Sequence, residues 1–99
     1  MKGEVSCGGQ YHMHMETQSS QATPTDDGGI SLHSSTQWLD LTLRSAVQTT
    51  GISSGLIRVT IPRVGGAYGA KITRSLMVSS AVAVAAKLTN LPVRCVVRH

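Results

Sequence analysis

The clearest alternation of apolar and polar side chains lies at residues 56–61, Leu-Ile-Arg-Val-Thr-Ile, and it predicts a β-strand that Pro62 ends. A similar pattern predicts a strand at residues 30–36, with Ile30 and Leu32 on one side. Extended structure is also predicted at residues 4–16, as two short strands separated by Gly8-Gly9, and at residues 92–97. Residues 19–29 contain proline, aspartate and paired glycines, and are predicted to be loop and turn.

Two segments have the pattern of helices. In residues 38–50, apolar side chains recur at helical spacing, and Gly51 is placed to cap the C-terminus; the predicted stripe consists of Leu39, Leu43, Ala46 and Val47. Residues 72–88 carry small side chains on nearly all sides, which predicts a buried helix that ends near Asn90. The predicted order β-β-β-α-β-loop-α-β indicates an α+β fold, with a mixed β-sheet and two covering helices.

Composition narrows the class of protein. With 99 residues the chain forms one domain at most, and its charged fraction of 14% is below the roughly one quarter of an average soluble protein, which suggests a piece buried in something larger. The net charge is +4, but the basic residues are scattered and only three aromatics are present, so nucleic-acid binding is disfavoured. The longest apolar run is too short to span a membrane. Without a secretory signal or a CxxC pair, a reducing, cytoplasmic setting is expected.

His12, His14 and Glu16 alternate along the first predicted strand and would share one of its faces. Imidazole and carboxylate groups in that arrangement could be metal ligands. Because nothing places the remaining ligands, half-exposed polar strand residues are the preferred interpretation.

Three glycines within residues 63–71, Arg-Val-Gly-Gly-Ala-Tyr-Gly-Ala-Lys, would let the backbone approach a bulky ligand closely. The amides at the start of the following helix could hold the anionic oxygens of a phosphate-bearing cofactor. Neither the Walker spacing nor the dinucleotide spacing is present, and a tight strand-to-helix turn remains an equal alternative. Gln37 lies at another strand-to-helix junction, where its amide could reach a pocket or could belong to an ordinary loop or cap.

Four blocks of the sequence together resemble the molybdenum hydroxylases of the aldehyde oxidase and xanthine dehydrogenase family. The resemblance extends from about Gly3 to Val97. The blocks are residues 8–17, Ser35-Thr36-Gln37, residues 63–74 and Pro92-Val93-Arg94-Cys95.

The resemblance implies that residues 1–99 are a fragment of the first molybdopterin-binding domain of a large enzyme. Such an enzyme hydroxylates aldehydes or N-heterocycles with oxygen from water, contains FAD and 2Fe-2S clusters in other domains, and is expected to be a homodimer. By the resemblance, Gln37 lies beside the molybdenum and hydrogen-bonds an oxo ligand, and the Tyr68 amide serves the same centre. Gly66 and Ala67 complete the implied cofactor-binding set. No catalytic base is implied in this chain, so it is expected to be inactive alone.

Departures from the family pattern refine these expectations. Ile72 occupies the position where xanthine dehydrogenases carry a substrate-binding glutamate, which makes the chain more similar to the aldehyde oxidases. Tyr68 replaces the usual phenylalanine, and Ala67 and Ala70 stand where glycine is common. After Cys95 the chain ends without the family's acidic segment, so a fragment is expected. The alternative is a truncated, non-catalytic interaction module that pairs with full-length subunits.

Overall fold

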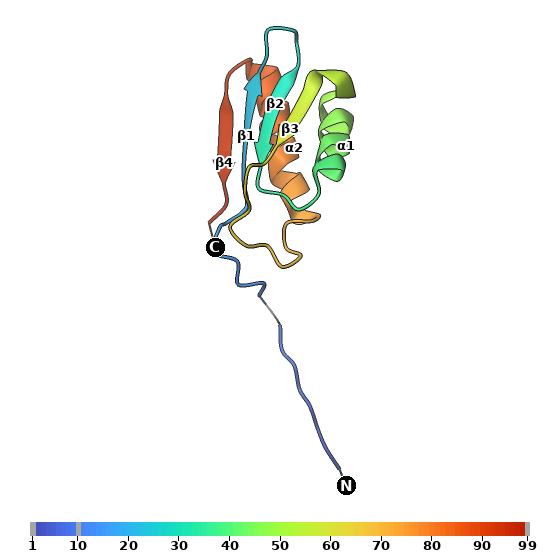
Figure 1. The fold of residues 1–99 in the computed structure, drawn as a ribbon, viewed down its shortest axis with the longest axis vertical. Coiled ribbons are helices and arrows are strands. Elements are labelled where there is room, and N and C mark those ends of the chain that lie inside the picture. The colour runs from blue at the N-terminus through green and yellow to red at the C-terminus, as the bar shows by residue number, and fades with distance from the viewer. Residues whose placement is uncertain (1, 10, 99) are drawn as a thin grey trace.

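The computed structural model describes residues 2–9 and 11–98. Within these residues, four strands form one sheet in the order β3-β2-β1-β4, and two α-helices cover it (Figure 1). The predicted α+β fold with a mixed sheet and two covering helices is therefore confirmed. The elements are β1 (Ser19–Pro24), β2 (Ile30–Ser34), α1 (Leu39–Thr50), a 3-10 turn η1 (Ser54–Leu56), β3 (Ile57–Thr60), α2 (Arg74–Thr89) and β4 (Val93–Val96).

The sheet combines both kinds of strand pairing. β1 pairs antiparallel with β2 on one side and with β4 on the other, whereas β2 pairs parallel with β3. A parallel pair needs a crossover connection, and α1 provides it between β2 and β3. α2 then crosses behind the sheet in the view of Figure 1, so that β4 joins the opposite edge.

The core lies between the sheet and the helices. Alternation along β1 and β2 directs Ala22, Ile30 and Leu32 inward, into one apolar cluster with residues from both helices. The facing side chains of α2 include Ala83 and Ala86, which have no exposed surface and let the helix approach the sheet closely. The core is built from small and medium side chains because the two layers lie so close together.

Both predicted helix ends are confirmed. Gly51 and Asn90 adopt left-handed conformations, with φ of 71° and 55°, and their N–H groups donate to the carbonyl oxygens of Val47 and Ala86. The second helix, predicted to be buried, is buried on one side only: Ala83 and Ala86 have no exposed surface, whereas Met77 is exposed on the outer face of α2. Neither helix in the described residues is long and apolar enough to cross a membrane.

The prediction for the N-terminal part is wrong. The described residues between 4 and 16 form no strand; residues 2–9 are exposed and extend away from the folded part (Figure 1), where no neighbouring strand pairs with them. The first strand is β1 instead, inside the segment predicted to be loop and turn. Its Ser, Thr and Pro residues are typical of turns, but β1 hydrogen-bonds to a strand on each side, and its inward-facing Ser20 and Ala22 fit under α2.

Candidate functional site

The Gln37 carboxamide is held by the backbone of the glycine loop. Gln37 Oε1 accepts hydrogen bonds from the N–H groups of Gly69 at 3.1 Å and Lys71 at 3.2 Å, and the Gln37 N–H donates to the Lys71 carbonyl oxygen at 2.9 Å. Only the oxygen of a carboxamide can accept from two N–H donors, so its orientation is fixed. Gln37 Nε2 therefore points away from the loop backbone, and it has no hydrogen-bond partner among residues 2–9 and 11–98.

The loop also presents main-chain donors beside Gln37. The N–H groups of Gly66, Ala67 and Tyr68 donate to no acceptor in the described part of the chain, whereas the Ala70 N–H closes a turn onto the Ala67 carbonyl oxygen at 2.9 Å. Tyr68 has a φ of 51°, uncommon for an aromatic residue, and its side chain is 73% exposed. Because the Gly69 nitrogen that bonds Gln37 is covalently joined to the Tyr68 carbonyl carbon, the structure places Gln37 next to Tyr68.

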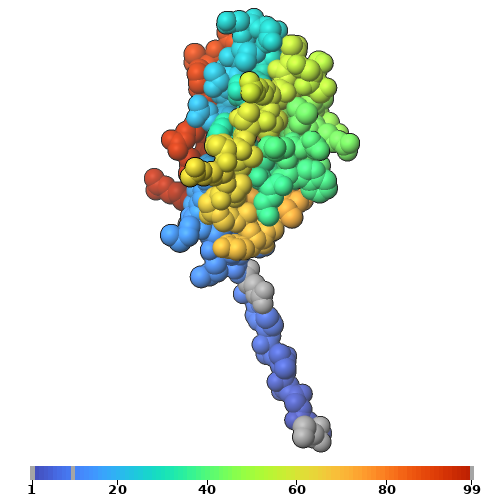
Figure 2. Space-filling view, viewed as in Figure 1, coloured from blue at the N-terminus to red at the C-terminus, as the bar shows by residue number. Residues whose placement is uncertain are grey.

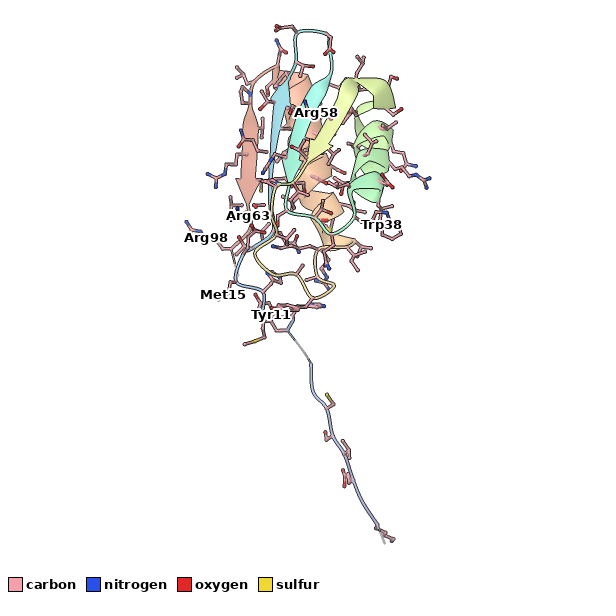
Figure 3. The ribbon with its side chains drawn as sticks, in the orientation of Figure 1. Tyr11, Met15, Trp38, Arg58, Arg63 and Arg98 are labelled. Atoms are coloured by element: carbon pink, nitrogen blue, oxygen red, sulfur yellow. The ribbon has the colours of Figure 1, made fainter. Side chains whose placement is uncertain are left out.

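Thr36 joins the start of α1 to the start of α2. Its Oγ1 accepts from the Trp38 N–H at 3.2 Å and lies 3.1 Å from the hydroxyl oxygens of both Thr42 and Ser75. The Ser75 hydroxyl also donates to the Lys71 carbonyl oxygen at 2.9 Å. Figure 3 shows Trp38 at the beginning of α1. This buried hydroxyl cluster fixes the end of the glycine loop against both helices.

A buried ion pair lies on the other side of the loop. The Lys71 side chain is 0% exposed, and its Nζ lies 2.5 Å from Oε1 of Glu16, whose side chain is 37% exposed. The Ser35 hydroxyl donates to the same Glu16 oxygen. Burial raises the pKa of Glu16, but the hydrogen bonds from Lys71 and Ser35 and the charge of Lys71 outweigh it and lower the pKa below its usual value of 4.5.

Gly65 is required where the Glu16 segment passes the loop. The Glu16 N–H donates to the Gly65 carbonyl oxygen at 3.1 Å, and a Cβ on Gly65 would lie 2.7 Å from the Glu16 Cβ. A side chain at this position would therefore force the two segments apart. Figure 2 shows the loop, in gold, against the blue segment that contains Glu16. We call the assembly of Glu16, residues 35–37 and residues 65–71 the loop junction.

Sequence reasoning missed the Glu16–Lys71 pair. The two residues are 55 positions apart, and Glu16 was predicted to lie on a strand. No local pattern indicates that these two side chains meet. The lysine comes directly after a glycine loop, and the glutamate stands at the end of an apolar-polar alternation. Nothing short of the folded chain places the carboxylate of one beside the ammonium of the other.

The alternation of His12, His14 and Glu16 does not form a strand face. His14 is buried, and its Nδ1 lies 2.6 Å from the Glu16 carbonyl oxygen, while the Glu16 side chain is engaged by Lys71. The described residues contain no group of three or more His, Cys, Asp or Glu side chains that could hold a metal ion. The described residues therefore do not hold His12, His14 and Glu16 as the set of metal ligands that the first hypothesis needed. They also do not form the half-exposed polar strand face of the preferred interpretation, because no strand is present there.

The loop does not lead directly into the helix as predicted. α2 begins at Arg74, and Ile72 lies between it and the turn at residues 68–71, with the Ile72 N–H donating to the Gly69 carbonyl oxygen at 3.4 Å. Two of the loop amides, those of Gly69 and Lys71, are already used by Gln37. Within the described residues, the loop N–H groups of residues 66–68 have no acceptor, and the Gln37 side chain adds a further donor.

Comparison with known proteins identifies the family of the chain. The sequence matches the family described as the molybdopterin cofactor-binding domain over residues 1–99. The chain belongs to this family, the cofactor-binding domains of the molybdenum hydroxylases. The molybdopterin-binding domain described here is 41% identical over 96 residues to a xanthine dehydrogenase/oxidase of Gallus gallus, covering 96% of the chain and 7% of that protein. It is 37% identical over 100 residues to aldehyde oxidase 3 of Mus musculus, covering 100% of the chain and 8% of that protein.

Solved structures support the same family. The molybdopterin-binding domain superposes with a TM-score of 0.77 and 28% identity on the aldehyde oxidoreductase of Desulfovibrio gigas, over 90% of this chain and 10% of that one. The TM-score is also 0.77, at 25% identity, with the quinoline 2-oxidoreductase of Pseudomonas putida 86, over 99% of this chain and 12% of that one. The chain thus spans about a tenth or less of the length of the curated relatives it matches.

The donors of the loop junction fit a molybdopterin cofactor. Such a cofactor carries phosphate oxygens and other electron-rich atoms, which need hydrogen-bond donors. Among residues 2–9 and 11–98, no acceptor is found for Gln37 Nε2 or for the loop amides of Gly66, Ala67 and Tyr68. Neutral donors on a loop fixed from two sides can bind such atoms with little rearrangement.

Proposed function

We propose that the chain is part of a molybdenum-dependent oxidoreductase that hydroxylates aldehydes or N-heterocycles with oxygen from water, and that this segment helps to hold the molybdopterin cofactor. The observation that carries the proposal is the Gln37 carboxamide, whose oxygen is fixed by two loop amides so that its N–H donors face outward. The remaining parts of the enzyme, with FAD and 2Fe-2S clusters, would lie in a longer chain. That enzyme would be a cytoplasmic homodimer.

In this proposal, Gln37 Nε2 and the N–H groups of Gly66, Ala67 and Tyr68 donate hydrogen bonds to acceptor atoms of the cofactor, with Gln37 and Tyr68 beside the metal. The bound cofactor supplies the redox chemistry, and this chain orients it. A general base must come from elsewhere, because the Glu16 carboxylate of the loop junction is already paired with Lys71. The 99-residue chain alone would therefore show no turnover when the cofactor is added.

The Gln37→Glu variant of the longer enzyme tests this role. One glutamate oxygen can still accept from Gly69 and Lys71, but the outward group changes from a donor to an anion. We expect kcat to fall by about 100-fold or more, as when a single donor to a reacting centre is removed. Gln48→Glu, on the exposed surface of α1, adds the same charge away from the site and is the control. Normal kcat and normal molybdenum content in Gln37→Glu would reject the proposal.

We propose further that the substrate site beside Ile72 favours aldehydes over purines. Ile72 offers an apolar side chain at the end of the loop and no carboxylate to bind a polar heterocycle. In the longer enzyme, Ile72→Glu is expected to increase kcat/KM for a purine relative to an aromatic aldehyde, while Ile72→Gln, which adds polarity without charge, changes the ratio less. An unchanged ratio in both variants would remove this position from substrate selection.

The alternative function, a non-catalytic interaction module, is favoured by one observation. Three large apolar side chains are exposed on α2 and just after it: Met77, Leu88 and Leu91. Size-exclusion chromatography with light scattering tests this alternative. Association of the chain with the longer enzyme, lost in the double variant Met77→Ser/Leu88→Ser, would support the alternative. A chain that stays monomeric and does not bind the longer enzyme would reject it.

A further inference from the structure

We propose that the Glu16–Lys71 ion pair is a positioning device for Gln37: it holds Lys71 where the Lys71 main chain can fix the carboxamide. This inference rests on the proposed function of Gln37 and adds to it two positioning residues that do not touch the cofactor. It also gives the N-terminal segment before β1 a role at the site, although that segment belongs to no strand or helix.

Lys71 is the residue on which the loop junction depends. Its N–H donates to Gln37 Oε1 and its carbonyl oxygen accepts from the Gln37 N–H, so both ends of Gln37 are tied to one residue. Its carbonyl oxygen also accepts from the Ser75 hydroxyl, which belongs to α2. A displacement of Lys71 would therefore change the orientation of the Gln37 carboxamide directly.

The side chain of Lys71 fixes that main chain through its charge. The ammonium group has no exposed surface, and Glu16 is its only hydrogen-bond partner in the described part of the chain. A buried ammonium without a counter-charge is strongly unfavourable, so the side chain stays inside only while the carboxylate is there. Glu16 itself is held at three points, by Lys71, by the Ser35 hydroxyl and by its main-chain N–H to Gly65.

Ser35 connects the ion pair to Gln37 by a second route. It lies two positions before Gln37, and its hydroxyl donates to the same Glu16 oxygen that accepts from Lys71. Glu16 therefore links the segment that carries Gln37 to the loop that orients it. If the Glu16 charge is removed, the Lys71 side chain must turn toward water, and the hydrogen bonds from Gly69 and Lys71 to Gln37 Oε1 should open.

Amide hydrogen exchange, followed by NMR on the 99-residue chain without cofactor, tests the inference. Glu16→Gln keeps the shape of the side chain and removes only its charge. We expect the Gly69 and Lys71 amides to exchange about tenfold faster, equivalent to about 1.4 kcal/mol in the opening free energy. The Gln37 side-chain amide resonances should shift, while amides in the middle of α1 keep their rates. Glu4→Gln, in the exposed N-terminal segment, is the matched control and should change none of these signals.

Ser35→Ala is a milder second variant, because it removes one hydrogen bond to Glu16 and leaves the ion pair in place. It should change the same signals in the same direction by a smaller factor. A lower Tm in Glu16→Gln with unchanged Gly69, Lys71 and Gln37 signals would overturn the inference, since the pair would then only stabilise the fold. Because the readout needs no cofactor, it is independent of the turnover test on Gln37→Glu.

Discussion

The core between sheet and helices and the loop junction are held together by different forces. The core is apolar, and Leu32 and Ala83 within it have no exposed surface and no polar side-chain atom. The loop junction buries Thr36, the Lys71 ammonium and the Ser35 hydroxyl, and each of them has a polar partner. Packing of apolar side chains therefore builds the scaffold, whereas pairing of polar groups builds the surface that can receive a ligand.

The core and the loop junction also differ in the hydrogen-bond donors that they leave without an acceptor in the described residues. In the sheet, β1 and β2 each hydrogen-bond to a strand on both sides, so the main-chain donors of these two central strands are used within the sheet. The loop junction uses two of its amides to fix the oxygen of Gln37, and its Gln37 Nε2 donates to no acceptor in the described residues. A site assembled by hydrogen bonds and one ion pair is specific in orientation but sensitive to the loss of a single partner.

The largest expected effect belongs to the core. Leu32→Ala on the central strand β2 should lower the free energy of unfolding by about 2–5 kcal/mol, because it removes a fully buried side chain and leaves a cavity. Leu88→Ala, at a position that is 79% exposed, should change it by less than about 0.5 kcal/mol. Urea unfolding measures both. Equal effects of the two substitutions would show that the apolar core does not stabilise the fold as described.

A smaller, asymmetric effect is expected at the ion pair. Glu16→Gln leaves a fully buried ammonium without a counter-charge, whereas Lys71→Met leaves a carboxylate that water can reach. Glu16→Gln should therefore lower the free energy of unfolding by about 1–3 kcal/mol and Lys71→Met by less. Urea unfolding of both variants gives the comparison. If Lys71→Met instead lowers the free energy of unfolding by more than Glu16→Gln does, burial of the ammonium is not the dominant cost, and the ion pair itself does not explain the asymmetry.

The scaffold could be predicted from the sequence because its signals are local. The alternation around Val59, the helical spacing of Leu43 and Val47, and the caps at Gly51 and Asn90 each depend on residues within a few positions. The failure at β1 has a physical cause as well. Its polar and small residues form a central strand only because β2, β4 and α2 surround it, and such tertiary context overrides local propensity.

The loop junction could be predicted only in part. The family resemblance singled out Gln37 and Tyr68, and the structure places these two residues side by side, although their roles toward a cofactor stay predictions. The contacts that fix them were not foreseen. The Gln37–Lys71 and Glu16–Lys71 contacts join residues 34 and 55 positions apart, and no local pattern reports which distant side chains will meet.

Acid should weaken the loop junction before it affects the core. The Glu16 pKa lies below its usual value of 4.5 in the folded chain, so its contribution to stability is complete above that value and is lost as the pH falls through the folded pKa. The pKa of Asp27 is also lowered, by the Thr25 hydroxyl and the Gly29 N–H, so its protonation acts in the same direction in the β1–β2 turn. The Tm of wild type and Glu16→Gln should therefore converge as the pH falls below 4.5. A constant difference in Tm across that range would contradict the assigned role of the carboxylate.

Hydrogen exchange of the Gly69 and Lys71 amides in Gln37→Ala tests whether the glycine loop holds the Gln37 carboxamide. These two N–H groups donate to Gln37 Oε1, whereas the neighbouring Ala70 N–H donates to the Ala67 carbonyl oxygen and is an internal control. If Gln37 is oriented by this loop, both amides should exchange about tenfold faster in the variant and Ala70 should keep its rate. Unchanged exchange at Gly69 and Lys71 would show that the carboxamide is not held there, and the candidate site would lose its basis.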